Sequence, residues 1–314
     1  MRPNDNLNLK KTCLAAAMAL SCAGRPATAA LVTFTIDTAQ SSVVLSGSLT
    51  VPRVGTFSYE TQGTGSLTTS YGGTVALELK PPNISFPGGS DIRLETNGVW
   101  QPSAAGEAGS QPADYAGRIT PPETTNYFAG RNIQFDVAGA ATLLSDGSFN
   151  PTNIVISYLT NSVPAPAIDF RVTSEVPGDS TNGSVSLVGS STNTTTGATL
   201  SSGSGLLTLV LPVHATNSLT FGSYPSTTIL DGQIVATAPA SAWPLFVTIS
   251  LAGTKLNLSW PALLGQSFSV QATGALGEPW GGASGTTKLA GGTATWTTVT
   301  TTNAAQFYRV VLSQ

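Results

Sequence analysis

Apolar and polar residues alternate along short stretches of this chain, most clearly between residues 255 and 260. In an extended backbone this alternation places the two leucines and the tryptophan of the stretch on one face and its polar residues on the other. Pro261 and Gly265 then interrupt the pattern, which resumes from 268 to 272. The pattern predicts two amphipathic strands joined by a short connection, each with one buried face.

Similar runs recur along most of the chain and are separated by Gly, Pro, Asn and Ser. The stretches with strand character are 31–36, 42–49, 74–79, 83–86, 91–94, 133–137, 141–144, 154–159, 167–173, 184–188, 205–213, 227–236, 245–251, 256–260, 268–272, 293–299 and 307–312. Outside the first 29 residues, no segment of useful length has the i, i+3, i+4, i+7 spacing of an amphipathic helix. Short strands separated by Gly and Pro turns predict an all-β fold, built as an antiparallel β-sandwich or barrel.

Two long stretches have no such period. Residues 99–127 are rich in Pro, Gly and Ala, and a stretch of this length without secondary structure is typical of a functional, packed or disordered loop. Residues 189–203 consist almost entirely of Ser, Thr, Gly and Asn, a composition that predicts a mobile loop. We therefore expect irregular backbone in both stretches.

The first 29 residues have the layout of a secretory signal peptide. Arg2, Lys10 and Lys11 precede a short apolar run at 13–23, and Ala27-Thr28-Ala29 then offers a small-x-small cleavage site. The apolar run is too short to span a bilayer. The leader predicts an exported protein, secreted or on the cell surface, whose mature chain starts near Ala30.

Both cysteines, Cys13 and Cys22, lie in this leader. The mature chain is therefore expected to have no disulfide and no thiolate nucleophile or metal ligand. An alternative to simple cleavage is an outer-membrane lipoprotein anchored through Cys22, but Ala19 stands where such a signal usually has a large aliphatic residue. No later stretch approaches about 18 consecutive apolar residues, so we expect no transmembrane segment after leader cleavage.

Composition narrows the possible partners. Apolar residues make up 40% of the chain and charged residues only 9%, against about 25% charged in typical globular domains. This balance favours a folded chain over a disordered one, because disorder usually accompanies high net charge. Four of the 13 basic and one of the 16 acidic residues lie in the leader, which leaves a mature net charge of −6. The sequence contains no stripe of basic residues with aromatic residues between them, so nucleic acid is not a predicted partner.

A proline-containing segment of small residues divides the mature chain. We interpret 237–244 as a linker between an N-terminal domain at 30–236 and a C-terminal domain at 245–314. The last 70 or so residues contain the strands of a small β-sandwich.

The C-terminal domain carries a recognisable pattern of residues. These are Leu258-Ser259-Trp260-Pro261, Phe268-Ser269-Val270-Gln271, Trp280 and Phe307-Tyr308-Arg309-Val310. The pattern resembles a C-terminal module of exported proteins from environmental bacteria, with Phe268 and Val270 in place of that module's usual Tyr and Leu. The resemblance implies an immunoglobulin-like or fibronectin type III-like β-sandwich, an exported setting and no chemistry. Residues 30–236 resemble only other exported β-proteins without a known activity.

The sequence offers little for catalysis. His214 is the only histidine, and no Gly-x-Ser-x-Gly elbow accompanies it, so the parts of a Ser-His-Asp triad are not assembled. A zinc site usually needs at least two His or Cys ligands. We therefore interpret His214 as a strand-end or surface residue and predict no metal site.

Paired carboxylates could in principle hydrolyse glycosides, which requires two of them roughly 5–10 Å apart. The candidates are Glu78, Asp91, Glu95, Asp114, Glu123, Asp136, Asp169 and Glu175. Alternation places Asp91 and Glu95 on the same strand face, but the interpretation we favour is that all these side chains face solvent. Accordingly we predict that the protein is not an enzyme and has no cofactor.

Residues 146–153 partly match a calcium loop, with oxygen-bearing side chains at its first, third and fifth positions. Pro151 stands where the loop requires glycine, and Ser157 where it requires a bidentate acid. A plain hairpin turn at Asp146 is the better interpretation.

Aromatic residues suggest a ligand surface. Trp100, Tyr115 and Tyr127 lie in the 99–127 region, and exposed rings of this kind can stack on sugars, whereas Trp260 and Trp296 are expected in the core. The leading hypothesis is an exported, non-catalytic structural or adhesive surface protein with extracellular polysaccharide or cell-surface components as partners. Its alternatives are a carbohydrate-binding protein that uses these three aromatics, and a β-barrel that binds an apolar ligand, suggested by the positive mean hydropathy of +0.14.

Overall fold

The computed structural model describes residues 29–51, 55–58, 67–95, 113–119, 124–159, 165–174, 181–187, 190–192, 195–221, 224–290, 292–299 and 306–313. These residues form antiparallel strands and two 3₁₀ helices, Pro151–Asn153 and Ala240–Ala242, and contain no α-helix. The all-β prediction is confirmed. The predicted leader, apart from Ala29, and Trp100 lie outside the described residues.

Thirteen strands form one large antiparallel sheet in the N-terminal domain. They are β1 (Ala30–Ile36), β2 (Ser42–Val51), β3 (Gly55–Ser58), β4 (Leu67–Lys80), β5 (Asn83–Pro87), β6 (Asp91–Leu94), β9 (Gln134–Thr142), β10 (Ser148–Phe149), β11 (Val155–Tyr158), β14 (Ser190–Thr192), β15 (Ala198–Gly203), β16 (Leu206–Phe221) and β17 (Tyr224–Pro239). The main path of the sheet runs β10-β15-β16-β17-β1-β4-β5-β9-β11-β14, and β2, β3 and β6 pair beside it.

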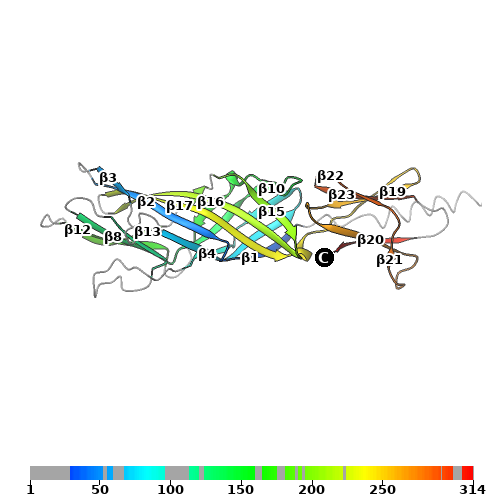
Figure 1. Ribbon diagram of the computed structural model, residues 1–314, viewed down its shortest axis with the longest axis horizontal. Helices are drawn as coiled ribbons and strands as arrows, with labels where there is room; N and C mark the ends of the chain where they lie inside the picture. Colours follow the sequence, from blue (N-terminus) through cyan, green and yellow to red (C-terminus); the bar gives the residue numbers. More distant parts are fainter. Residues whose placement is uncertain are drawn as a thin grey trace, which may run out of the picture.

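This sheet curls over, so that strands far apart in its order share one hydrophobic core. The rings of Phe86 in β5 and Phe149 in β10 lie 6.4 Å apart, although five strands separate β5 from β10 in the sheet. The longest hairpin, β16–β17, pairs strands of 16 residues each and crosses the domain in Figure 1. Leu207, Leu209 and Leu211 of β16 are all buried, because every second side chain of a strand points to the same face.

A second, four-stranded sheet in the order β13-β12-β8-β7 contributes to the same core. Its strands are β7 (Tyr115–Ile119), β8 (Thr124–Arg131), β12 (Ala167–Ser174) and β13 (Thr181–Ser186). Phe128 of β8 and Ile168 of β12 are buried in the cluster that the large sheet forms. The N-terminal domain therefore has one core with two sheets around it.

The prediction of irregular backbone is wrong for parts of both stretches that lacked a hydrophobic period. Strand β7 and the start of β8 lie inside 99–127, and β8 pairs with β12 along its whole length. Strand β15 lies inside 189–203 and pairs with β16, with Leu200 fully buried. Neighbouring strands supply the hydrogen-bonding partners in each case, so tertiary context decides the conformation of segments whose own pattern is weak.

The C-terminal domain is a sandwich of two antiparallel sheets. One has the order β18-β19-β23-β22 and the other β21-β20-β24. The strands are β18 (Thr248–Ala252), β19 (Lys255–Pro261), β20 (Ser267–Thr273), β21 (Gly281–Gly282), β22 (Thr286–Ala290), β23 (Thr293–Val299) and β24 (Phe307–Ser313). Trp260 and Trp296 are buried in the core between the sheets, as predicted, and the Trp260 ring meets that of Phe268 edge-on at 5.5 Å.

The predicted linker at 237–244 begins too early. Strand β17 continues to Pro239, and Thr237 pairs with both Thr208 and Thr35. Ala238 is buried in the N-terminal core, so its small side chain marks close packing and not a flexible connection. The segment between the two domains is 240–247 and starts with a 3₁₀ helix.

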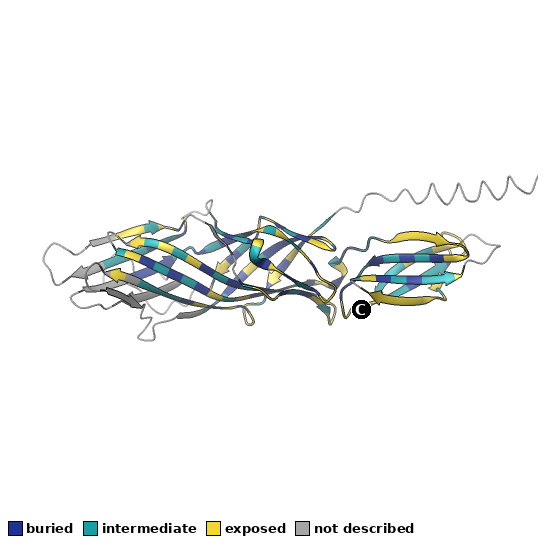
Figure 2. Ribbon diagram, turned by 90° about the horizontal axis from the view of Figure 1, so that it is seen from above, coloured by how far each residue is buried: buried dark blue, intermediate teal, exposed yellow. Residues whose placement is uncertain are grey.

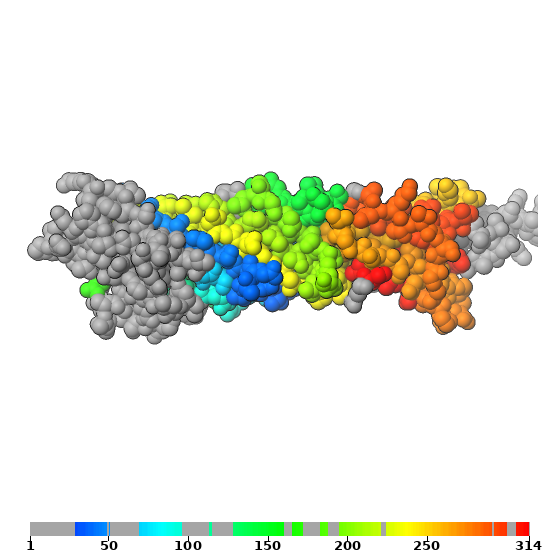
Figure 3. All heavy atoms as spheres, viewed as in Figure 1, coloured from blue at the N-terminus to red at the C-terminus, as the bar shows by residue number. Residues whose placement is uncertain are grey.

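The two domains follow each other along the long axis of the molecule (Figures 1 and 3). Burial alternates along most strands of the N-terminal domain, whereas exposed strands border the C-terminal domain in Figure 2. Strands β18 and β22, the two edges of the larger C-terminal sheet, are exposed at every residue. The junction between the domains and these open edges are the two places where function is best sought.

Candidate functional site

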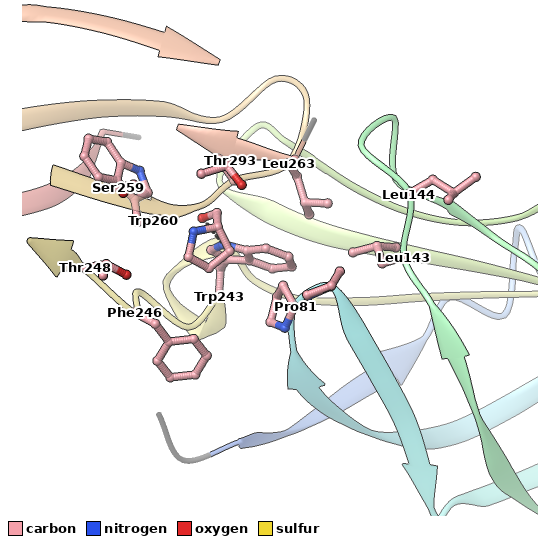
Figure 4. A pocket seen from close by; sticks show the side chains of 14 residues that line it. Pro81, Leu143, Leu144, Trp243, Phe246, Thr248, Ser259, Trp260, Leu263 and Thr293 are labelled. Carbon is pink, nitrogen blue, oxygen red and sulfur yellow. Dashed lines mark hydrogen bonds between the residues drawn. The ribbon is translucent and has the colours of Figure 1, made fainter. Parts of the chain in front are cut away.

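A cleft of about 280 Å³ lies at the junction between the two domains (Figure 4). The N-terminal domain lines it with Pro81, Pro82, Leu143 and Leu144, which come from the β4–β5 turn and the end of β9. The connecting segment adds Trp243 and Phe246, and the C-terminal domain adds residues from β18, from the end of β19 and from the start of β23. The cleft therefore exists only because the domains meet.

Trp243 fastens the connecting segment to both sides of this cleft. Its side chain is buried in the core cluster of the N-terminal domain. Its indole Nε1–H donates to the carbonyl oxygen of Pro261 in the C-terminal domain, at 3.1 Å. Since a buried indole nitrogen needs a partner, the hydrogen bond and the burial of the ring support each other.

Leu263 makes the reciprocal contact from the C-terminal domain. It follows β19, yet its side chain is only 2% exposed and belongs to the N-terminal core cluster. The turn that presents it is held by Gln266, whose Oε1 accepts the Leu263 amide at 2.8 Å. Gly265 in this turn has a φ of +92°, and a Cβ there would lie 2.9 Å from the Ser202 carbonyl oxygen in β15. The turn thus packs directly against the N-terminal sheet.

The described lining of the cleft contains no ionisable side chain. Its side-chain hydroxyls come from Thr248, Ser259 and Thr293. Hydroxyls without a neighbouring base cannot act as nucleophiles or move protons at neutral pH. The cleft can hold the domains in register or accept a small neutral molecule, but its residues do not support acid–base chemistry.

The three aromatics predicted to bind sugar are only partly placed. Trp100 lies outside the described residues. Tyr115 occupies the first position of β7, where its partner is Gly130, and Tyr127 in β8 is paired with Arg118. The two tyrosines are thus in neighbouring strands of the smaller N-terminal sheet, while their side chains fall outside the described part. The sugar-binding surface stays a prediction.

His214 lies on the surface of the β16–β17 hairpin. Its backbone partner in β17 is Asp231, and its Nδ1 lies 3.5 Å from Asp231 Oδ1. The side chains of His214 and Asp231 are 38% and 65% exposed, so the pair lacks the desolvated setting in which a catalytic histidine is usually held.

Several candidate carboxylates have structural partners. Asp91 is paired with the guanidinium group of Arg93, which raises the pKa of Arg93. Asp169 accepts from Nε of Arg131 at 2.8 Å. Asp136 accepts the backbone amides of three residues at 2.8–3.0 Å, namely Gly89, Ser90 and Val137. Each of the three side chains therefore has a partner that holds it in place.

Asp114 is a candidate carboxylate that is partly buried. Burial raises the pKa of Asp114, while the Ile133 amide that donates to its Oδ2 at 2.6 Å and the nearby Arg131 act in the opposite direction. A raised carboxyl pKa is typical of general acids, and the charge of Glu95, another candidate carboxylate, also raises the pKa of Asp114. The Ile133 contact ties Asp114 to the strand connection before β9.

The segment at Asp146 is a turn, but the predicted hairpin is wrong, because among the described strands β10 pairs with β15 whereas β9 pairs with β5, β6 and β11. Asp146 Oδ1 accepts from both the amide and the hydroxyl of Ser148, at 2.9 and 2.7 Å. These hydrogen bonds lower the pKa of Asp146. The backbone closes through the Leu144 amide, which donates to the Ser148 carbonyl oxygen at 2.8 Å.

A small void lies among the described residues of the N-terminal interior. This void of about 10 Å³ lies between β4, β9, β11, β16 and β17, where Tyr71, Phe135 and Val213 are among its lining residues. That volume is near the minimum for one water molecule. The hydroxyl of Tyr71 beside it is buried and has no hydrogen-bond partner among the described residues, and burial raises the pKa of Tyr71 strongly.

Sequence reasoning missed the residues of the junction. The sequence pattern assigns Trp243 to a linker and Leu263 to a turn between two strands. The signal that could have found Trp243 is a large aromatic residue in a segment otherwise made of small ones. Leu263 and the exposed Leu264 are consecutive leucines, and only the docking of the domains distinguishes them.

Three further observations complete the description of the chain. Among the described residues, no group of three or more His, Cys, Asp or Glu side chains could hold a metal ion. Within the same part of the chain, no helix is long and apolar enough to span a bilayer. Comparison of the sequence with protein-family models and with curated proteins, and of the fold with solved structures, finds no match.

Proposed function

We propose that this chain is an exported, non-catalytic structural or adhesive protein, in which two β-domains are joined end to end by a stiff junction. The observation that carries the proposal is the double anchoring of that junction. Leu263 of the C-terminal domain is buried in the N-terminal core, and Trp243 bonds back to Pro261. A junction of this kind fixes the orientation of one domain relative to the other. A spacer or display protein needs such a fixed orientation to hold one end of the molecule away from the other.

The strand order of the C-terminal domain supports an immunoglobulin-like identity for that module. In immunoglobulin sandwiches one sheet has the order A-B-E-D and the other contains C next to F. Taken in chain order from β18 as A, the sheet β18-β19-β23-β22 corresponds to A-B-E-D, and β21-β20-β24 to C′-C-F. Modules of this architecture are frequent in cell-surface proteins.

The stiffness of the junction can be tested by small-angle X-ray scattering on the mature chain, residues 30–314. The proposal expects a single extended particle whose maximum dimension does not change with Leu264→Ala and whose flexibility increases with Leu263→Ala. A compact or freely flexing wild-type particle would contradict it.

Catalysis and adhesion are tested by two separate assays. In the first, the mature chain is incubated with panels of polysaccharides and esters to measure turnover. In the second, fluorescent beads coated with the protein are tested for retention on insoluble polysaccharides and on cell envelopes. We expect no turnover and retention on at least one surface. Turnover that disappears when one carboxylate, such as Asp114, is replaced by Asn would show that the protein is an enzyme. Retention lost in Trp100→Ala and kept in Trp280→Ala would identify the predicted aromatic surface as the contact.

Export is tested by the N-terminus of the protein recovered outside the cell. A start near Ala30 is the expected result. A lipid-modified Cys22 at the N-terminus would instead show that the protein is anchored to a membrane and not secreted. That result would not affect the two-domain architecture.

A further inference from the structure

The edge strand β18 in the C-terminal domain presents apolar residues toward the sandwich interior that no other described strand covers. Ile249 is paired with Leu258 and Leu251 with Leu256 in the neighbouring strand β19. Directly opposite residues in an antiparallel pair point to the same face, and both β19 leucines are buried in the core. Ile249 and Leu251 therefore face inward, yet they are 51% and 62% exposed.

The opposing sheet is too narrow to reach β18. It has three strands against four, and β21 is joined to β22 by residues 283–285 alone. Three residues can bridge the roughly 10 Å between packed sheets but cannot also cross a sheet, so β21 and β22 lie at the same edge of the sandwich. The strands β21, β20 and β24 then lie over β22, β23 and β19, and the position over β18 is left open.

The open position has the shape of a strand site. Its floor is the apolar pair on β18, and its side is the outer edge of β24, which pairs only with β20 among the described residues. Tyr308 and Val310 of β24 already pack into the core next to it. A strand placed about 4.8 Å from β24 would complete the ladder of hydrogen bonds on that edge and would set alternate side chains onto Ile249 and Leu251.

Most exposed sheet edges carry charges that discourage pairing, lysine above all. Strand β22, the other edge of the same sheet, has Lys288 at its centre. Strand β18 has no charged residue. The edge at β18 therefore lacks the protection that the edge at β22 has.

The geometry admits a single strand and excludes a second sandwich. Because β18 extends one strand beyond β24, a second copy of the module that approached the β24 edge would place its own β19 where β18 already lies. Charge selects further among single strands. The four strands that frame the site contain Lys255 and Arg309 and no Asp or Glu, and Lys255 is exposed where β18 turns into β19.

We propose that the C-terminal domain accepts an extended segment of a different protein as an additional antiparallel strand between β24 and the face of β18. The segment has apolar residues at every second position and an acidic residue toward its C-terminal end, which lies beside Lys255. The mode of recognition is β-strand addition, in which main-chain hydrogen bonds give affinity and alternate side chains give specificity. This inference does not depend on the proposed structural or adhesive role, because it concerns only the partner of the C-terminal domain.

The test uses the mature chain and a short fluorescent peptide in which valine alternates with threonine and which ends in glutamate. Fluorescence anisotropy measures its dissociation constant. We expect binding that weakens at least tenfold, about 1.4 kcal/mol, in the double variant Ile249→Thr, Leu251→Thr. The matched variant Leu289→Thr changes a residue of the opposite edge strand that is 45% exposed, and should bind within about twofold of the wild type. A peptide of the same pattern with proline at the threonine positions should not bind, because proline cannot donate to a ladder.

Hydrogen exchange supplies a readout that does not depend on the variants. The valine peptide should slow exchange of the β24 amides and leave those of β22 unchanged. Equal binding by the wild type and the double variant, or protection at β22 instead of β24, would overturn the proposal. Concentration-dependent self-association of the protein alone that the double variant abolishes would assign the site to a second copy and would also overturn it.

Discussion

The indole Nε1–H of Trp243 donates to the carbonyl oxygen of Pro261 across 3.1 Å, and this hydrogen bond joins two parts of the chain with separate cores. The ring of Trp243 belongs to the N-terminal core, whereas Pro261 ends a strand of the C-terminal sandwich. Leu263, two residues further on, enters the N-terminal core from the opposite direction. Because the connecting segment and the C-terminal domain each bury one side chain in the N-terminal core, the mechanical properties of the junction should depend on very few residues.

Replacing Leu263 by Ala should destabilise the junction strongly. A buried leucine truncated to alanine typically costs about 2–5 kcal/mol, through lost burial and the cavity left behind. Leu264, the next residue, is 63% exposed, so Leu264→Ala is the matched control and should cost under about 0.5 kcal/mol. Urea denaturation measures both changes. Similar costs for the two variants would mean that Leu263 does not hold the domains together.

Replacing Trp243 by Phe isolates the hydrogen bond from the burial of the ring. The phenyl ring keeps much of the apolar contact but leaves the Pro261 carbonyl oxygen without its donor, which should cost about 1–3 kcal/mol. Trp280→Phe serves as control, because Trp280 lies at the surface beneath the guanidinium group of Arg309. We expect the unfolding midpoint to fall for Trp243→Phe and to change little for the control. Equal unfolding midpoints for the two variants would show that the hydrogen bond between Trp243 and Pro261 does not stabilise the junction.

Five of the seven described strands of the C-terminal domain could be predicted from the sequence, whereas β21 and β22 lie outside the predicted stretches. The reason for the agreement is visible in β19. Its apolar residues alternate without interruption and all of them are buried, so the local period and the tertiary environment agree. The second half of β16 extends beyond the predicted strand at 205–213. Asn217 and Ser218 in β16 have no apolar character, yet they pair with Thr228 and Thr227, and such polar strands give no period-two hydrophobic signal.

The candidate site could not be predicted in the same way. Trp243 and Leu263 are buried through the docking of two domains, and docking depends on which surfaces meet in space. No local period encodes that relationship. The uncovered face of β18 has the same origin. The alternation of Ile249 and Leu251 predicts a strand with one buried face, and only the width of the opposing sheet leaves that face exposed.

Removing the hydroxyl of Tyr71 should not destabilise the protein. That hydroxyl is buried without a hydrogen-bond partner among the described residues, and an unsatisfied buried polar group is unfavourable by about 1–3 kcal/mol. Tyr71→Phe is therefore expected to leave the free energy of unfolding unchanged or to raise it by about 1 kcal/mol. A loss of stability greater than that would reveal a partner for the hydroxyl.

Tyr158 provides the contrast in the same core. Its hydroxyl oxygen accepts from Nδ2 of Asn217 at 2.7 Å, and its ring packs 4.8 Å from that of Phe135, which also meets Tyr71. Tyr158→Phe removes the acceptor and should lower the free energy of unfolding by about 1 kcal/mol. Urea denaturation of both variants at one pH measures the difference. Equal effects of the two substitutions, or a larger loss of stability in Tyr71→Phe than in Tyr158→Phe, would contradict the hydrogen-bond assignment.

Asp114 should make the protein less stable at neutral pH than an uncharged residue would. Burial raises the pKa of Asp114 above its unfolded value, so folding disfavours the ionised form. This unfavourable contribution is fully present above the folded-state pKa and disappears as the pH falls below the unfolded value of about 3.9. In Asp114→Asn the amide oxygen can still accept from the Ile133 amide. The variant should therefore be more stable than the wild type at pH 7, by a margin that shrinks on acidification.

Asp146 should show the opposite dependence on pH, which makes it the control for Asp114. Hydrogen bonds from Ser148 lower the pKa of Asp146 below its unfolded value, so folding favours the ionised form. That stabilisation is present above the unfolded pKa and is lost as the pH falls through the folded-state value. Asp146→Asn should accordingly be less stable than the wild type at pH 7 and should approach it in acid. Thermal unfolding of both variants between pH 7 and pH 3 tests the pair, because a general effect of net charge would shift both differences in the same direction.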